Sequence, residues 1–243
     1  MGRRTVLEVG VALVVGVVLG TGAHALLGSA GAATAPSAQV AGATLERSAG
    51  VPDLVTSVAT SSVVEVFVVS CGTSRQASAT YVRDRSGRDM LLTNRHVVRG
   101  AAMAQVVLPD GRSVELAVLG GLVGKDAALL DAHPLQQAGL RPAREGSVVD
   151  AGAPVVAAGH PAGEFRLDAT TVDDVSRRAA YGSASDVLLI DTPAVGGHSG
   201  GAVFDRSGSV VGLVAARDPG TGDVVAYRIG ELTGAALGPS PGC

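Results

Sequence analysis

The sequence predicts an all-β fold, and three observations support this prediction. Apolar residues make up 47% of the 243 residues but aromatic residues only 2%, so the core must be built from Val, Leu and Ala, and valine-rich segments favour sheet. Short apolar runs recur from residue 63 to residue 229. Turn signals separate these runs, as expected for hairpins in a barrel or a sandwich: Pro109-Asp110-Gly111, Arg206-Ser207-Gly208 and Asp218-Pro219-Gly220.

The predicted elements fill the chain beyond residue 50. Pro52 and Asp53 open a short helix over residues 54–60, and a second short helix is expected at residues 231–237. A chain of this length can bury one core or form two small lobes. The apolar runs between the helices predict strands at residues 63–70, 77–83, 90–93, 104–108, 113–119, 127–131, 155–159, 165–171, 187–190, 202–204, 210–215 and 224–229.

Residues 1–28 are predicted to be an N-terminal signal or anchor segment. Arg3 and Arg4 precede a largely apolar run over residues 9–27, which is long enough to form a transmembrane helix. The flanking arginines would stay in the cytoplasm and the rest of the chain would lie outside it. Triplets such as Ala30-Gly31-Ala32 also fit cleavage by signal peptidase. A secreted protein and a membrane-anchored one both stay open, and we favour the anchor, with the membrane as a partner.

Residues 29–50 are predicted to be a flexible linker. Their composition is dominated by Ala, Gly, Ser, Thr and Pro, without a period that could bury one face. The folded domain is therefore expected to cover residues 51–243.

The string Gly197-His198-Ser199-Gly200-Gly201 carries the strongest chemical signal. As G-x-S-x-G it would match the nucleophile turn of α/β-hydrolases, in which the serine is followed by an acid and then by a histidine. All five histidines of this chain precede Ser199, so this order is excluded. The residues after Ser199 also alternate as in a hairpin, not as in a helix.

Glycines around Ser199 suggest a loop whose amides bind an anion. They let the amides of Gly197 and Ser199 point at one spot, as in an oxyanion hole. A serine nucleophile needs a histidine base and an acid that orients it. His96 follows an apolar strand and Asp126 begins another, with Asp131 as the rival acid. The order is then His, Asp, Ser.

Three strings resemble the T-N-x-H-V-V, D-x-A-x-L and G-N-S-G-G-P boxes of trypsin-like serine proteases of the HtrA type. The strings begin at Thr93, Asp126 and Gly197, and the similarity covers about residues 63–229. In addition, Cys71-Gly72 ahead of Gln76-Ala77-Ser78 and the terminal Pro241-Gly242-Cys243 resemble periplasmic protease domains of the colicin V production (MarP) type. The resemblance implies a chymotrypsin-like fold of two six-stranded antiparallel β-barrels, at about residues 60–140 and 145–232. It also implies an endopeptidase that needs no cofactor.

The resemblance assigns a role to each of the candidate residues. His96 would be the general base and later the acid, Asp126 would orient it, and Ser199 would attack the scissile carbonyl. Cys71 and Cys243 would be paired, as two cysteines in an oxidising compartment usually are. Two cysteines without a nearby histidine do not make a zinc site, so no metal is expected.

The chain departs from the family pattern at several positions. His198 replaces the usual Asn, Ala202 replaces Pro, and Ala77-Ser78-Ala79 replaces Gly-Ser-Gly. We hypothesise that protonation of His198 at mildly acid pH changes the oxyanion loop. These departures keep an alternative open, in which the domain is a catalytically impaired pseudoprotease that acts as a binding module.

The resemblance to trypsin-like proteases also predicts which residues contact the substrate. The strand at Leu213, Val214 and Ala215 would form one wall of the pocket for the residue before the cut, and Pro193 would lie near its base. None of these residues is charged, so a small or medium apolar side chain is expected there. The net charge of −3 argues against a nucleic-acid partner. Protein or peptide substrates and a monomer are expected.

Overall fold

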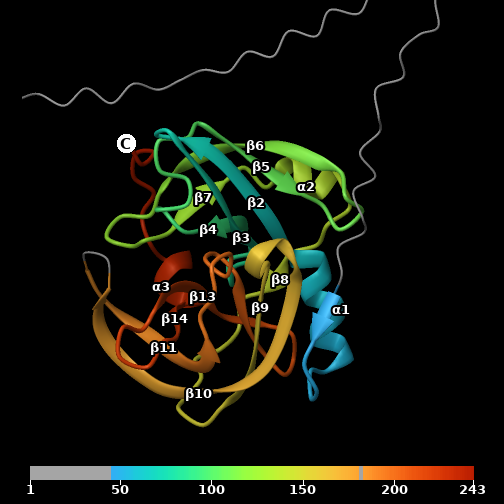
Figure 1. Cartoon of the computed structure of the whole chain (residues 1–243), viewed down its shortest axis with the longest axis vertical. Helices are drawn as coiled ribbons and strands as arrows, with labels where there is room; N and C mark the ends of the chain where they lie inside the picture. Colours follow the sequence, from blue (N-terminus) through green and yellow to red (C-terminus); the bar gives the residue numbers. More distant parts are fainter. Residues whose placement is uncertain (1–44, 181–182) are drawn as a thin grey trace, which may run out of the picture. The chain divides into compact units, whose positions relative to one another are not determined.

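The computed structural model describes residues 45–180 and 183–243, so the predicted signal or anchor segment and most of the predicted linker lie outside the described residues. Within these two ranges, no helix is long and apolar enough to cross a membrane. Strands dominate, and they form two closed barrels (Figure 1).

The first barrel has six antiparallel strands, in the upper half of Figure 1. Their order is β2-β5-β6-β7-β4-β3, and β3 pairs again with β2 and closes the barrel. A short strand, β8 (Ala143–Arg144), extends it in parallel beside β3. The six strands are β2 (Val63–Ser70), β3 (Thr73–Arg83), β4 (Asp89–Thr93), β5 (Met103–Val107), β6 (Ser113–Gly121) and β7 (Ala128–Leu130).

The second barrel also has six antiparallel strands, in the order β9-β10-β11-β14-β13-β12, and β12 pairs with β9 to close it. Another short strand, β1 (Leu45–Arg47), lies parallel to β10. The predicted all-β fold of two six-stranded barrels is therefore confirmed. The six strands are β9 (Pro154–Gly159), β10 (Phe165–Ala180), β11 (Ser183–Pro193), β12 (Ala202–Asp205), β13 (Val210–Arg217) and β14 (Asp223–Arg228).

Strand β1 corrects the end of the predicted linker. All three of its residues are exposed, so no apolar pattern marks it in the sequence. Backbone bonding holds the segment instead: Ser48 N donates to Leu167 O at 2.9 Å, and Ala169 N donates to Ser48 Oγ at 2.8 Å. The chain thus joins the second barrel before residue 51.

The helices differ from the prediction in length and number. Helix α1 (Asp53–Ser62) is slightly longer than expected, and α2 (His133–Gln137) and the 3-10 turn η1 (Pro161–Gly163) were not predicted. Helix α3 (Ile229–Thr233) ends before residue 237 because the chain leaves it at Gly234. Leu237 then forms a β-bridge with Leu122, so the tail joins the first barrel.

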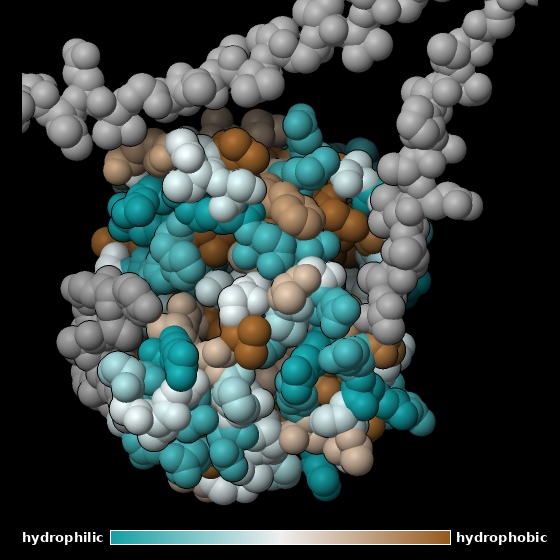
Figure 2. All heavy atoms as spheres, in the orientation of Figure 1, coloured by the Kyte–Doolittle hydropathy of each residue, from teal (hydrophilic) through white to brown (hydrophobic). Residues whose placement is uncertain are grey.

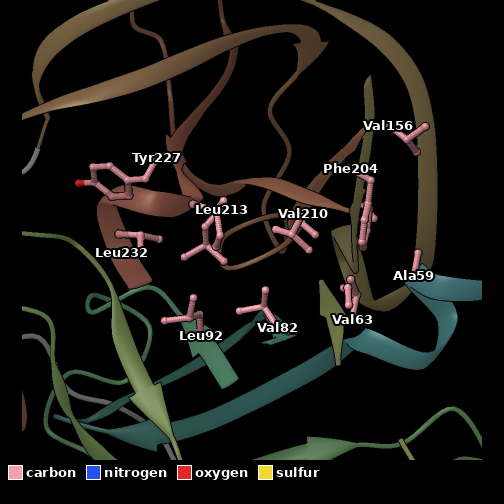
Figure 3. Close-up of a cluster of buried hydrophobic side chains, with 14 of the residues drawn as sticks. Ala59, Val63, Val82, Leu92, Val156, Phe204, Val210, Leu213, Tyr227 and Leu232 are labelled. Carbon is pink, nitrogen blue, oxygen red and sulfur yellow. The ribbon is translucent and has the colours of Figure 1, made fainter. Parts of the chain in front are cut away.

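Three clusters of buried apolar side chains form the core. One fills the first barrel around Tyr81 and Leu91, and another fills the second barrel around Leu188 and Ile190. The third lies between the barrels: Figure 3 shows Val82 and Leu92 of the first barrel facing side chains of the second, among them Leu213 and Val210. Strands of the first barrel thus bury both faces, because successive side chains point to opposite sides of a sheet.

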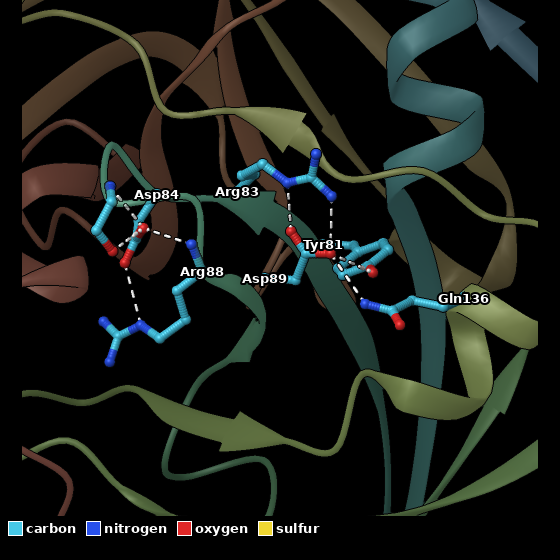
Figure 4. Close-up of polar contacts among 7 residues, drawn as sticks. Tyr81, Arg83, Asp84, Arg88, Asp89 and Gln136 are labelled. Carbon is cyan, nitrogen blue, oxygen red and sulfur yellow. Dashed lines mark hydrogen bonds and ion pairs between the residues drawn. The ribbon is translucent and has the colours of Figure 1, made fainter.

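Polar contacts fix the hairpin between β3 and β4 (Figure 4). Asp84 accepts hydrogen bonds from Ser86 and Arg88 across the turn. Beside it, Asp89 accepts two bonds from Arg83, at 2.6 and 3.0 Å. Bidentate pairs of this kind fix geometry as well as charge, so this hairpin holds the strand that leads to His96.

The surface is mixed in polarity. On the face drawn in Figure 2, hydrophobic residues form small separate groups among hydrophilic ones. Exposed large apolar residues lie far apart in the sequence, such as Leu54 in α1, Val69 in β2 and Val148 in the loop before β9. Single exposed apolar residues are normal on soluble domains.

Candidate active site

His96 and Asp126 lie at the ends of two paired strands. His96 is in the turn after β4, and Asp126 precedes β7. Because β4 and β7 are antiparallel, with Thr93 opposite Ala128, the end of one strand meets the start of the other. His96 Nδ1 lies 2.6 Å from Asp126 Oδ2, and His96 N donates to Asp126 Oδ1 at 2.9 Å. The pairing of the strands therefore dictates the pairing of the side chains.

Burial differs sharply between the two members of this pair. Asp126 is 6% exposed, whereas the side chain of His96 is 43% exposed. Asn94 Nδ2 donates to Asp126 O at 2.8 Å, and Asp126 N donates to the hydroxyl of Tyr227, from the second barrel, at 3.3 Å. A buried carboxylate thus orients a ring that solvent and a substrate can reach.

Asp131, the rival acid, lies at the other end of β7. Its Oδ1 accepts a hydrogen bond from His133 N at 3.0 Å, at the start of α2. Asp126, and not Asp131, is the acid that pairs with His96.

Ser199 lies on the loop from β11 to β12, whose glycines are required by sterics. Gly197 and Gly200 have φ angles of +99° and +81°, a region that disfavours side chains. A Cβ atom would collide with His160 O at position 197, and with Ser78 O at position 200. The loop can pack this closely on its neighbours only with glycine at positions 197 and 200.

Strand β3 of the first barrel binds the carbonyl groups of this loop. Ser78 N donates to Ser199 O and Ser78 Oγ donates to Gly197 O, both at 2.8 Å. Thr80 Oγ1 donates to Gly200 O at 2.9 Å. The position of Ser199 in the second barrel therefore depends on side chains of the first.

The amides of Gly197 and Ser199 face away from the interior of the loop. Gly196 O accepts a hydrogen bond from the backbone of η1 at 3.1 Å, and His198 O accepts one from Gly201 N at 2.8 Å. In a trans peptide the N–H and the C=O point in opposite directions, so the next amides point the other way. Within the described part of the chain, neither amide donates to another protein group. Such amides can stabilise an anionic oxygen.

His198 is buried beside this loop, with 5% of its surface exposed. Its Nδ1 accepts a long hydrogen bond from Val195 N, at 3.4 Å. Burial lowers the pKa of His198; the carboxylate of Asp168 opposes this effect and Arg166 adds to it. The fold thus disfavours the protonated ring, and any titration of His198 is displaced from mildly acid pH to lower pH.

A second buried histidine, His160, supports the loop through its backbone. His160 N donates to Ser78 Oγ at 2.8 Å, and His160 O accepts from Gln76 Nε2 at 2.7 Å. Burial lowers the pKa of His160 to about 4. The ring packs on Phe165 with 4.9 Å between centroids.

The alanines of the Ala77-Ser78-Ala79 string point away from the loop. Ala77 and Ala79 are buried in the core of the first barrel, while Ser78, between them, faces the loop. Alanine at these two positions therefore fills the core and leaves the loop contacts intact. Ala202 is likewise buried, at the start of β12.

The predicted pocket residues lie next to the loop, but most of their side chains are buried. Leu213 and Ala215 belong to the cluster between the barrels, and Val214 to the core of the second barrel. The backbone of Val214 contacts the loop, where its O accepts from Gly200 N at 2.9 Å. Pro193 is exposed at the end of β11. The strand can therefore face a peptide mainly with its backbone.

Cys71 and Cys243 form a disulfide that closes a loop with a sequence separation of 172 residues. Gly100 N also donates to Pro241 O at 2.6 Å, and Gly121 N to Pro239 O at 3.1 Å. These bonds hold the tail beside the turn that carries His96. Among the described residues, no cluster of His, Cys, Asp or Glu is suited to a metal ion.

The trypsin-like peptidase domain family matches residues 77–213, which include His96, Asp126 and Ser199. The chain belongs to this family.

Curated relatives of this trypsin-like peptidase domain are proteases of the HtrA type. The serine protease Do-like HtrA of Lactobacillus helveticus is 27% identical over 146 residues, which are 58% of this chain and 35% of the relative. A Bartonella henselae protein named "probable periplasmic serine endoprotease DegP-like" is 31% identical over 146 residues, 59% of this chain and 29% of the relative. The chain thus spans about a third of the length of these relatives.

Solved structures of trypsin-like peptidases share the fold. The Rv3671c protease from M. tuberculosis in its active form has a TM-score of 0.69 and 22% identity, over 87% of this chain and 99% of that one. The HtrA-type protease AlgW with a tripeptide has a TM-score of 0.64 and 24% identity, over 74% and 60%. At this level of sequence identity, the similarity shows only that these proteins share the fold of two barrels.

The residues that brace the Ser199 loop and Asp126 were not predicted from the sequence. Ser78 and Thr80 are fully buried polar residues on β3, and Tyr227 reaches Asp126 from the other barrel. A signal was available for the first two, because polar residues at alternate positions of an otherwise apolar strand share one face. The contact of Tyr227 depends on the packing of the barrels, and no local pattern predicts it.

Proposed function

We propose that this chain is an extracytoplasmic serine endopeptidase with His96, Asp126 and Ser199 as its triad and the amides of Gly197 and Ser199 as its oxyanion hole. The bond of 2.6 Å between His96 Nδ1 and Asp126 Oδ2 carries the proposal. It joins an exposed histidine to a buried carboxylate, the arrangement that a serine nucleophile requires.

Acylation begins when Ser199 Oγ attacks the scissile carbonyl carbon. Asp126 holds the proton of the ring on Nδ1, so Nε2 of His96 accepts the hydroxyl proton. The carbonyl oxygen becomes an oxyanion and is stabilised by the amides of Gly197 and Ser199. The imidazolium then gives its proton to the leaving amine as the C–N bond breaks, which leaves an ester on Ser199.

Deacylation repeats these steps with water as the nucleophile. His96 removes a proton from water, the hydroxyl attacks the ester carbon, and the same amides stabilise the second oxyanion. The proton returns to Ser199 Oγ as the acid product leaves. No step requires a cofactor.

Location and substrate class are part of the proposal. The arginines and the apolar run of residues 1–28 and the periplasmic name of one relative support a protease domain outside the cytoplasm. Protein or peptide substrates, with a small or medium apolar residue before the cut, are proposed because Pro193 and the strand at Leu213, Val214 and Ala215 carry no charge.

A fluorophosphonate probe tests the proposal on the purified full-length chain. Labelling is expected across about pH 5 to 8, the range in which histidines titrate, and it should disappear in Ser199→Ala. Ser57→Ala removes an exposed serine of α1 and should label like the native chain. Labelling that survives in Ser199→Ala would overturn the assignment. A folded chain that labels at no pH would favour the pseudoprotease.

A further inference from the structure

A basic pocket lies beside His96. It has a volume of about 510 Å³, and it is formed by the turn after β4, the turn before β7 and the C-terminal tail. Arg95 and Arg99 line it from the first turn, Lys125 from the second, and Pro241 and Gly242 from the tail. The pocket is thus continuous with the histidine that we propose as the base.

Two guanidinium groups supply the positive charge of this pocket. Arg95 and Arg99 are exposed, and within the described residues neither forms an ion pair. Arg75 adds a third positive charge nearby, since its Nη1 lies 3.4 Å from Arg99 O. Lys125 contributes little, because its Nζ forms an ion pair with Glu231 at 2.6 Å.

Two acidic side chains next to the pocket are already bound. Asp126 is buried and hydrogen-bonded to His96, and Glu231 is paired with Lys125. Arginine presents a planar set of donors that matches a carboxylate. The unpaired charge of the pocket therefore favours an anionic group from outside the chain.

We propose that this pocket is a substrate subsite that binds an acidic side chain close to the scissile bond, with Arg95 and Arg99 as its specificity-determining residues. The proposal rests on the proposed peptidase function, because only then does a peptide pass beside His96. An extended peptide advances about 3.3 Å per residue, so the acidic residue would lie within a few positions of the cut. A basic residue at the same position would be repelled.

The test compares peptides that carry Asp, Asn or Lys in turn at each position flanking a fixed cleavage site. For the native full-length chain we expect one position at which Asp raises kcat/KM above Asn, by roughly two- to fivefold for each arginine, as for exposed ion pairs. Lys should lower it. The preference should weaken in high salt, because salt screens exposed charges.

Variants assign the preference to the pocket. In the double variant Arg95→Gln, Arg99→Gln the ratio of Asp to Asn peptides should fall to near one. Arg206→Gln removes an exposed arginine in the turn after β12 and should leave the ratio unchanged. Equal cleavage of Asp and Asn peptides at every position, or an Asp preference that persists in the double variant, would overturn the proposal.

A binding measurement distinguishes a failure of the proposed subsite from a failure of the proposed peptidase activity. The Asp and Asn peptides are titrated against Ser199→Ala and against the same variant with both arginines replaced. Weaker binding of the Asp peptide after the arginines are replaced supports the subsite, even if the chain cleaves nothing. Cleavage of the Asn peptide that depends on Ser199, without any Asp preference, would leave the peptidase standing and reject the subsite.

Discussion

The two barrels position their parts of the site by different means. In the first barrel, His96 and Asp126 bond directly to each other at the ends of paired strands. In the second, Ser199 lies on a glycine loop whose carbonyl groups are bound by β3 of the first barrel. The proposed acid and base thus depend mainly on one barrel, whereas the proposed nucleophile depends on the packing of both. A substitution can therefore disturb the pair of His96 and Asp126 without disturbing the Ser199 loop, or the reverse.

The largest effect is expected from Asp126→Asn, which disrupts the pair of His96 and Asp126 in the first barrel. An amide at this position can no longer hold the proton of His96 on Nδ1, so kcat should fall by about 10⁴-fold, as found for the wrong tautomer in other serine proteases. The measurement is kcat on a peptide substrate, with circular dichroism to show that the variant is folded. Asp131→Asn, at the other end of β7, is the control and should retain activity. A comparable loss in Asp131→Asn would mean that the acid is wrongly assigned.

Acid pH should weaken the support of the Ser199 loop. Burial lowers the pKa of His160 to about 4, whereas a histidine in the unfolded chain titrates near 6.5. Between these values the unfolded state binds more protons, so stability is lost as the pH falls from about 6.5 towards 4. Urea unfolding at pH 7 and pH 4.5 should show a loss of about 2 kcal/mol from this group.

The matched variant for this measurement is His160→Gln, which cannot titrate. The difference in stability between the two pH values should be smaller in the variant by that amount. An equal loss in both chains would show that His160 is already protonated in the folded chain at pH 4.5, so that burial does not lower its pKa.

Ser78→Ala should loosen the loop without touching the pair of His96 and Asp126. It leaves Gly197 O and the amide of His160 without a buried partner, at a cost of about 1 to 2 kcal/mol. The freed loop should also lower kcat by roughly tenfold, because small misplacements of reacting groups are costly. The exposed Ser74 lies on the same strand, and Ser74→Ala is the control. Unchanged kcat in Ser78→Ala would show that the glycines alone set the loop.

Local patterns were sufficient to predict the strands of the two barrels and the three motifs. The apolar runs that begin at Val63 and Val210 predict strands, and the glycines at positions 197 and 200 predict a tight loop, because each signal depends on near neighbours in the sequence. Strand β1 escaped prediction because its residues are exposed and are held only by backbone bonds to β10. The contacts of Ser78 with Gly197, 119 positions apart, depend on how the barrels pack, which no local pattern encodes.

The smallest effect is expected from a substitution of Lys125, which links the turn that carries Asp126 to the second half of the chain. Lys125 precedes Asp126, is 11% exposed, and binds Glu231 of α3 at 2.6 Å and Ser185 of β11 at 2.7 Å. Lys125→Met should cost about 1 kcal/mol or less, because Met keeps the packing of the side chain and Glu231, whose side chain is 34% exposed, stays in contact with solvent. It should change kcat little because the strands of the first barrel still hold Asp126. A double-mutant cycle with Glu231→Gln measures the coupling, which should be about 0.5 to 1 kcal/mol. A large fall in kcat in Lys125→Met would mean that Asp126, like Ser199, is positioned by both barrels, and the contrast between the two halves of the site would then disappear.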